Sequence, residues 1–366
     1  MTDVGDHKQG SLDFGHEDVR DLSAGQVGNA PILMFAQWFT DAYQGEAFTT
    51  TVPWYIDGQR GEISISVSSV ATDQEPAVAS QIDARFLMCV LTKAAEIAKD
   101  NNGSVPGKIR ISVQEYLKAT AQKKTTYISK ELIKSVNRLR NSRIVTDIRD
   151  EKTGAETHFS WVSEATVNYR YRYVNDEAGH DGKRREQMLT SFDIVLPEFL
   201  KRLVQVEMGG AIRPYQLGYF QIKSPTIMRI YEIANVAPEV FKIPMSKLHV
   251  HVGGSTTLRY FKRNVLRAFR RQIAASPEDN SAWEPLLPGF SVYLYANNEE
   301  PSLHWLDDTP PKGDVWLYFE KGGQQYANLD RSLEDVIEYH PEQLTDYQKN
   351  LIVSSVRSKG GEALMT

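Results

Sequence analysis

Apolar residues recur at spacings of three and four in two stretches of the chain, the pattern of a helix with one buried face. Within residues 253–273 these positions are Leu258, Phe261, Val265, Phe269 and Ile273, and within residues 125–140 they are Ile128, Leu132, Val136 and Leu139. Hydroxyl side chains that can cap a helix precede both stripes. The pattern therefore predicts two capped amphipathic helices.

The polar faces of these two predicted helices carry a single sign of charge. Residues 253–273 contain six Lys or Arg residues and no acidic one, and residues 108–140 contain nine against only Glu115 and Glu131. A helix that needs only solubility usually mixes both signs, so a basic face indicates a polyanionic partner. An ordinary solvated basic face is the alternative for either helix alone. Their joint occurrence favours two DNA-reading helices.

The elements around the first basic helix follow the winged-helix order, a variant of the helix-turn-helix. The predicted elements are a helix at 82–99, a strand at 109–112, a short helix at 114–119, the basic helix, and wing strands at 143–149 and 156–162. A polar, glycine-containing turn at 150–154 has the composition of a hairpin loop. Residues 143–162 are therefore expected to form the first wing.

The same order is predicted around the second basic helix. Its elements are a helix at 226–236, a strand at 241–244, a short extended link at 247–252, the basic helix, and wing strands at 291–295 and 303–306. The wing strands alternate apolar and polar residues as half-buried strands do. Two modules in tandem predict two contacts with DNA.

Three further segments complete the predicted architecture. Residues 49–56 and 62–68 read as a β-hairpin that packs on the first module. Residues 169–174 alternate tyrosine and arginine; strand alternation explains this pattern on structural grounds, and stacking on exposed bases is the alternative. We expect an α+β fold with two tandem winged-helix domains, an N-terminal β-hairpin extension and a C-terminal extension. The expected boundaries are a mobile acidic tail at 1–30, the first domain with its strands at 31–175, a linker or loop at 176–187, the second domain at 188–309, and an acidic extension at 310–366.

Composition limits the class of protein. With 366 residues and 41% hydrophobic content the chain can build two cores of ordinary size, and no apolar run is long enough to span a membrane. The net charge of −5 hides a strong asymmetry, because residues 299–346 hold twelve acidic and three basic residues. The single cysteine, Cys89, lies in an apolar run and is expected to be a buried thiol. These features predict a soluble protein of the cytoplasm.

Evidence for catalysis in the sequence is slight. The pair His249 and His251 with the downstream Tyr260 resembles the metal-binding histidines and tyrosine nucleophile of DNA-nicking enzymes. No third metal ligand is evident, and Tyr260 belongs to a helix already explained by DNA reading. A phosphate-binding loop of the G-x-x-x-x-G-K-[ST] type does not occur. We expect a protein that is not an enzyme and that needs no cofactor or metal, with a metal-dependent tyrosine nickase as the least favoured alternative.

Several segments together resemble the plasmid replication initiator proteins known as replication initiator protein A, over roughly residues 45 to 306. The resemblance rests on the helix at 82–94, the run 127–144 before a strand at Thr146, the segment 159–161, the helix at 227–234 and the basic segment 255–263. It implies two winged helices that bind repeated sites in double-stranded DNA at a plasmid origin. It also implies opening of the origin, recruitment of the host replicative helicase or initiator, and homodimers that repress their own gene and limit copy number.

The candidate DNA-binding residues follow from these predictions. In the first module they are Lys123, Lys124, Thr125, Thr126, Ser129, Lys130, Lys134, Asn137, Arg138 and Lys152, and in the second Ser255, Thr256, Thr257, Arg259, Lys262, Arg263, Arg267, Arg270 and Arg271. Arg263 and Arg267 are the expected base contacts of the second module. A transcription regulator with two winged helices and no role in replication is the main alternative. It predicts inverted repeats in the target, whereas an initiator predicts direct repeats.

Overall fold

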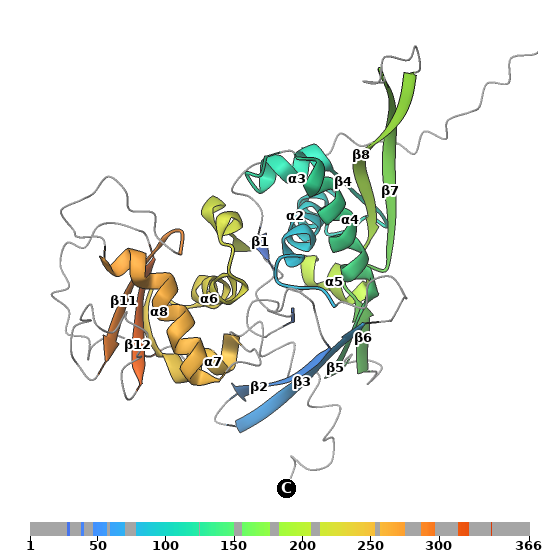
Figure 1. The fold of residues 1–366 in the computed structure, drawn as a ribbon. Helices are drawn as coiled ribbons and strands as arrows, with labels where there is room; N and C mark the ends of the chain where they lie inside the picture. The colour runs from blue at the N-terminus through green and yellow to red at the C-terminus, as the bar shows by residue number, and fades with distance from the viewer. Residues whose placement is uncertain are drawn as a thin grey trace, which may run out of the picture.

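The computed structural model describes residues 28–29, 38–39, 47–56, 59–69, 78–123, 125–149, 156–175, 183–205, 213–252, 257–274, 287–296, 314–321 and 338. Over these residues the chain forms helices packed against small antiparallel sheets (Figure 1). The mixed helix and sheet content expected from the hydrophobic pattern is confirmed.

The elements have the following bounds. The helices are α2 (Ala84–Asp100), α3 (Val113–Ala119), α4 (Thr126–Asn141), α5 (Glu198–Val204), the 3-10 helix η2 (Leu217–Gln221), α6 (Pro225–Val236), α7 (Met245–Val252) and α8 (Leu258–Ala274). The strands are β1 (Gly28–Asn29), β2 (Phe48–Ile56), β3 (Gln59–Ser69), β4 (Ile109–Ser112), β5 (Ser142–Arg149), β6 (Glu156–Ser160), β7 (Glu164–Asn175), β8 (Lys183–Val195), β9 (Arg213–Pro214), β10 (Val240–Pro244), β11 (Phe290–Ala296) and β12 (Val315–Lys321).

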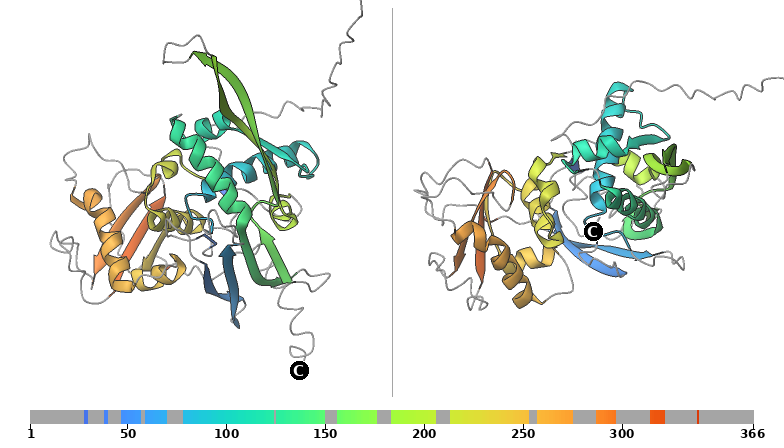
Figure 2. Two further views of the ribbon diagram at one scale, coloured as in Figure 1. Left: turned by 45° about the vertical axis from the view of Figure 1, so that its right-hand side comes forward. Right: turned by 45° about the horizontal axis from the view of Figure 1, so that its top comes forward.

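Two parts of the chain share one order of elements and one sheet topology. The series α2, β4, α3, α4, β7, β8 in the first part corresponds to α6, β10, α7, α8, β11, β12 in the second, apart from the insertion of β5 and β6 after α4. In each part the short strand pairs with the second strand of the later hairpin, which gives the sheet orders β4-β8-β7 and β10-β12-β11. Figure 2 shows each helical group beside its own sheet. The chain therefore repeats one structural unit.

The hairpin that completes the first unit is β7–β8, which corrects the expectation that residues 143–162 form it. Strands β5 and β6 do pair, but β5 also pairs with β3 in a separate sheet of order β2-β3-β5-β6. Strand β4 instead lies opposite residues 191–194 of β8. Ile111 lies opposite Phe192 in this register, and both side chains are buried. Apolar side chains therefore stabilise the pairing of β4 with β8. Residues 183–187, expected in a linker, are the first residues of β8.

The second unit differs from expectation in two elements. Residues 245–252 form helix α7 and not an extended link, because Met245, Leu248 and Val252 lie three and four residues apart and bury one helical face. The partner of β11 is β12, which lies in the expected C-terminal extension and forms the centre of its sheet. The expected wing strand at 303–306 lies outside the described residues.

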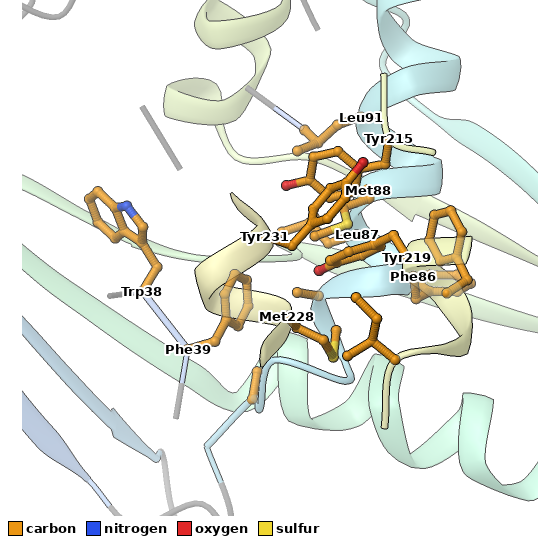
Figure 3. Close-up of a cluster of buried hydrophobic side chains, with 14 of the residues drawn as sticks. Trp38, Phe39, Phe86, Leu87, Met88, Leu91, Tyr215, Tyr219, Met228 and Tyr231 are labelled. Atoms are coloured by element: carbon orange, nitrogen blue, oxygen red, sulfur yellow. The ribbon is translucent and has the colours of Figure 1, made fainter. Parts of the chain in front are cut away.

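The two units meet through a continuous apolar core, part of which is drawn in Figure 3. Aromatic rings from η2 and α6 pack together, with Tyr219 and Tyr231 at 5.0 Å between ring centroids, beside Phe86, Leu87 and Met88 of α2. A polar network crosses the same boundary.

The buried carboxylate of Glu232 in α6 forms the centre of that network. It accepts hydrogen bonds from Gln81 Nε2 at 2.5 Å and from the Tyr219 hydroxyl at 3.1 Å, and it pairs with Arg229 at 2.8 Å. Burial raises the pKa of Glu232, while Arg229 opposes that shift. A buried network of this kind specifies how α6 docks against the segment preceding α2.

Candidate nucleic-acid interface

Helix α8 separates a buried apolar face from an exposed basic one. Phe261, Val265 and Phe269 of the predicted stripe are buried, which confirms the helical prediction for the second basic stretch. Arg259 and Arg267 are exposed, and Arg263 between them is half-buried. These three arginines recur every four residues and therefore form one row along the helix.

The middle arginine of this row is held by an aromatic ring. The Arg263 guanidinium lies 4.8 Å from the centroid of the Tyr260 ring, and the ring itself is exposed. A cation–π contact restrains the side chain, and the Nε atom of Arg263 is buried. Thr257 precedes the helix, is exposed, and its carbonyl accepts the Phe261 N–H at 2.9 Å, as expected at a helix N-terminus.

Lys262 does not belong to the exposed row, which corrects its assignment as a DNA contact. Its side chain is buried, and its ammonium lies 3.7 Å from the carboxylate of Asp314, the residue before β12. The same carboxylate accepts a hydrogen bond from the Ser246 N–H at 3.2 Å and another from the Ser246 hydroxyl. Lys262 follows the buried Phe261 and lies on the inner side of α8. Through Asp314 it links α8 to α7 and to the start of β12.

Helix α4 presents a similar exposed face. Lys130, Lys134 and Asn137 are exposed, and Ser129 is partly exposed. Just before the helix, Lys123 is exposed and the Thr125 hydroxyl accepts a hydrogen bond from the Ile128 N–H at 3.2 Å, which confirms the predicted cap. Lys134 also lies 3.5 Å from Glu131, but an exposed pair of this kind contributes little to stability.

Arg138 is the second correction among the candidate DNA contacts. Its guanidinium donates hydrogen bonds to both carboxylate oxygens of Asp83, at 2.8 and 2.6 Å. Asp83 is fully buried before the first turn of α2 and also accepts a hydrogen bond from the Ser135 hydroxyl at 2.5 Å. The two-pronged geometry makes Arg138 a tie between α4 and α2.

The remaining candidates lie outside the described structure. They are Lys124, Lys152, Ser255 and Thr256, together with the side chains of Thr126, Arg270 and Arg271.

The β7–β8 hairpin was not expected from the sequence, which predicted a strand at 169–174, with stacking on bases as the alternative, followed by a linker or loop. The hairpin packs beside α4 and projects beyond the helices in Figure 1 and in the left view of Figure 2. Tyr169, Arg170 and Tyr171 of β7 are exposed. The strict alternation of Tyr and Arg correctly predicted a strand. The charged residues that follow it resembled a linker, so strand β8 was not predicted in full. No local pattern indicated that β8 pairs with β4.

An ion pair fixes this hairpin to β4. Arg110 donates from Nε to Asp193 Oδ1 at 2.6 Å and from Nη2 to Oδ2 at 3.0 Å. These hydrogen bonds hold the pKa of Asp193 below its ordinary value, with a smaller contribution from Asn168, and they raise that of Arg110. The base of the hairpin is therefore anchored to β4.

The helical geometry around His249 and His251 differs from that of the nicking enzymes considered above. Both residues lie on α7, two positions apart, and side chains at that spacing do not share one face of a helix. The ring of His249 packs 5.0 Å from that of Phe261, and His251 is buried. Within the described ranges no group of three His, Cys, Asp or Glu side chains is placed to hold a metal ion. None of the helices described is long and apolar enough to cross a membrane.

Comparison with known proteins gives a consistent result. A solved structure of domains 2 and 3 of RctB superposes with a TM-score of 0.52 at 13% identity, covering 81% of this chain and 98% of that one. A candidate replication protein of Wigglesworthia glossinidia brevipalpis is 22% identical over 203 residues, which are 53% of this chain and 66% of that protein, slightly less than two thirds of its length. The family model of replication initiator protein A matches residues 54–276. The chain therefore belongs to the replication initiator protein A family.

Proposed function

We propose that this protein binds double-stranded DNA at a replication origin through two winged-helix modules and initiates replication there. The observation that carries the proposal is the repeated unit, in which α4 and α8 occupy equivalent positions and each presents an exposed basic face. In a winged helix this position is that of the helix that enters the major groove. Family membership supports the role in replication.

The row of arginines on α8 suits base recognition. Arginine offers a planar fork of donors that can bind both acceptors on the major-groove edge of guanine. Arg263 is the best placed for this, because Tyr260 restrains its guanidinium. Arg259 and Arg267 lie one turn to either side and are suited to phosphates or to neighbouring bases.

The exposed face of α4 combines side chains suited to phosphates with side chains suited to bases. Lys130 and Lys134 are flexible point charges that bind phosphate without reading sequence. Ser129 and Asn137 have short polar side chains that can contact base edges. In each unit the hairpin, β7–β8 or β11–β12, would then be the wing that contacts the sugar-phosphate backbone.

The biological partners follow from the family as part of the same proposal. Monomers bind direct repeats at a plasmid origin, assist its opening and recruit the host replicative helicase or initiator. Homodimers repress the protein's own gene and thereby limit copy number. In this proposal the protein acts by binding and carries out no catalytic step of its own.

Selection of bound sites from random duplex DNA at physiological salt tests this proposal. We expect enrichment of intact duplexes with a site of about two helical turns, read in two successive major grooves. Direct repeats support an initiator, and inverted repeats support a transcription regulator. Magnesium-dependent cleavage that Tyr260→Phe abolishes would show a nickase, and the absence of any enriched sequence would contradict sequence-specific binding.

A further inference from the structure

We propose that the tyrosine face of the β7–β8 hairpin binds single-stranded DNA by stacking Tyr169 and Tyr171 on unpaired bases. The inference rests on the proposed function, because a protein that opens an origin meets an unpaired strand next to its duplex site. It adds a second DNA ligand, of different chemistry, to the duplex read by α4 and α8.

The outer part of the hairpin is a two-stranded ribbon that extends past its sheet. Strand β4 pairs only with residues 191–194 of β8, whereas β7 and β8 remain paired out to Asn175 and Lys183. The ribbon begins at a β-bulge after Asn168, where the Thr190 hydroxyl donates a hydrogen bond to the Asn168 carbonyl at 3.0 Å. Bulges of this kind redirect a strand and its side chains. The ribbon therefore leaves the sheet in a defined direction, as Figure 1 shows.

Large apolar side chains are rarely exposed in the described part of this protein. The exposed ones are Tyr127, Tyr169, Tyr171, Val250 and Tyr260. Tyr169 and Tyr171 are 40% and 49% exposed, although the rings of Tyr215, Tyr219 and Tyr231 are buried in the core. Aromatic side chains that remain exposed on an extended hairpin indicate a binding surface.

The ribbon carries an excess of positive charge, which suits a nucleic acid. Positions 169–175 and 183–189 hold five Lys or Arg residues and one acidic residue, Glu186. Tyr169 and Tyr171 lie two residues apart on β7 and therefore share one face of the ribbon, while the exposed Arg170 lies between them on the other face. An unpaired strand at this ribbon would therefore meet basic residues close to the tyrosine rings.

The spacing of the tyrosines distinguishes a single strand from a duplex. Side chains two residues apart on a strand are separated by about 7 Å. Successive bases in one strand of a duplex are about 3.4 Å apart and are stacked on each other. Duplex bases therefore leave no ring surface for these tyrosines. An extended single strand can place one base against each ring, or one base between two rings, while its phosphates meet the basic positions.

Fluorescence anisotropy with the full-length protein tests the proposal, using a labelled single-stranded oligo-dT and a labelled duplex carrying the selected site. We expect the double variant Tyr169→Ala/Tyr171→Ala to lose single-strand affinity by about tenfold for each ring removed. Its affinity for the duplex should fall by a clearly smaller factor, because a wing meets the duplex through its sugar-phosphate backbone and not by stacking on bases. The matched control Tyr169→Phe/Tyr171→Phe keeps both rings and should bind the single strand as the wild type does. Thermal unfolding verifies that each variant is folded.

Two results would overturn the proposal. Equal losses of single-strand and duplex affinity in the alanine pair would make the hairpin an ordinary duplex contact. A phenylalanine pair as weak as the alanine pair would show that the hydroxyls, and not the rings, bind DNA. Arg263→Ala separates this inference from the proposed function, because it should weaken duplex binding and leave single-strand binding unchanged. Single-strand binding that depends on the rings, in a protein with no duplex preference, would support the inference and refute the proposed function.

Discussion

Arg138 of α4 donates hydrogen bonds to both carboxylate oxygens of Asp83, the buried residue before α2, at 2.6 and 2.8 Å. This pair joins the candidate reading helix to the helix on which it rests. A basic residue of α4 thus sets the position of the helix while its neighbours Lys130 and Lys134 remain exposed to a ligand.

Replacement of Arg138 by alanine should lower stability far more than it lowers DNA affinity. The substitution leaves the Asp83 carboxylate buried without its cation, and losing one partner of a buried pair costs about 3–5 kcal/mol. Urea unfolding measures the loss. Lys134→Ala is the matched control on the same helix, because it removes an exposed charge and should change stability by less than about 0.5 kcal/mol. Similar stability in the two variants would contradict the structural role of Arg138.

Lys262→Met should lower stability and Arg259→Met should weaken DNA binding, although the two residues lie on one helix. Lys262 is buried next to Asp314, so its replacement leaves that carboxylate without the ammonium and should lower the free energy of unfolding by about 1–3 kcal/mol. Arg259 is exposed, so its replacement should weaken duplex binding and reduce its salt dependence. Unfolding and binding are measured for both variants. A loss of salt dependence in Lys262→Met without a loss of stability would return Lys262 to the DNA interface.

Arg263→Ala should relax sequence preference. If the Arg263 guanidinium reads a base, its removal costs about 1–3 kcal/mol on the selected duplex and much less on random DNA. Competition binding with the two duplexes at one salt concentration measures the difference. Equal losses on both would reassign Arg263 to the phosphate backbone. Tyr260→Ala, which removes the ring under the guanidinium, should show a weaker effect in the same direction.

Stability should depend on acid pH through Asp193. Arg110 holds the pKa of Asp193 below that of the unfolded chain, so the stabilising contribution is complete above the unfolded value of about 4 and is lost as the pH falls through the folded value. Because half of the Arg110 side chain is exposed, the contribution is at most about 1 kcal/mol. Asp193→Asn should therefore lose less stability than the wild type between pH 5 and pH 2 (about 1 kcal/mol at most). Parallel urea-unfolding curves for the two proteins across this range would contradict the assignment.

Cys89 should not react with thiol reagents in the native protein. It is fully buried in α2, and burial raises the pKa of its thiol well above the usual range. We expect a colorimetric thiol reagent to modify it only at the rate at which the protein unfolds. Rapid labelling under native conditions would show that α2 is exposed to solvent.

Much of the local structure could be predicted from the sequence. Most errors concerned which strands pair and which side chains form ion pairs. The stripes of α4 and α8, the Thr125 cap and the buried Cys89 follow from spacing and composition within a few residues. The extended link predicted at 247–252 was wrong because the stripe over the eight residues Met245–Val252 is too short to distinguish a helix from a strand by pattern alone.

Selection of the DNA-facing residues shows the same limit. Lys262 and Arg138 have the residue type and helical setting of DNA contacts, yet each pairs with an aspartate that is distant in sequence. Long basic side chains can turn toward a carboxylate or toward solvent, and the choice depends on which carboxylates the fold brings near. Arg259 and Lys130 remain candidates because the described fold leaves them exposed.

The sequence by itself determined where the basic helices lie, how they begin and which face they bury, because helical periodicity and capping act over four residues or fewer. Only the tertiary structure decided that β8 pairs with β4, that β12 completes the second sheet, and that Lys262 and Arg138 pair with Asp314 and Asp83. Strand pairing and ion pairing join residues many positions apart. Their partners are set by the packing of the whole core and not by any local pattern.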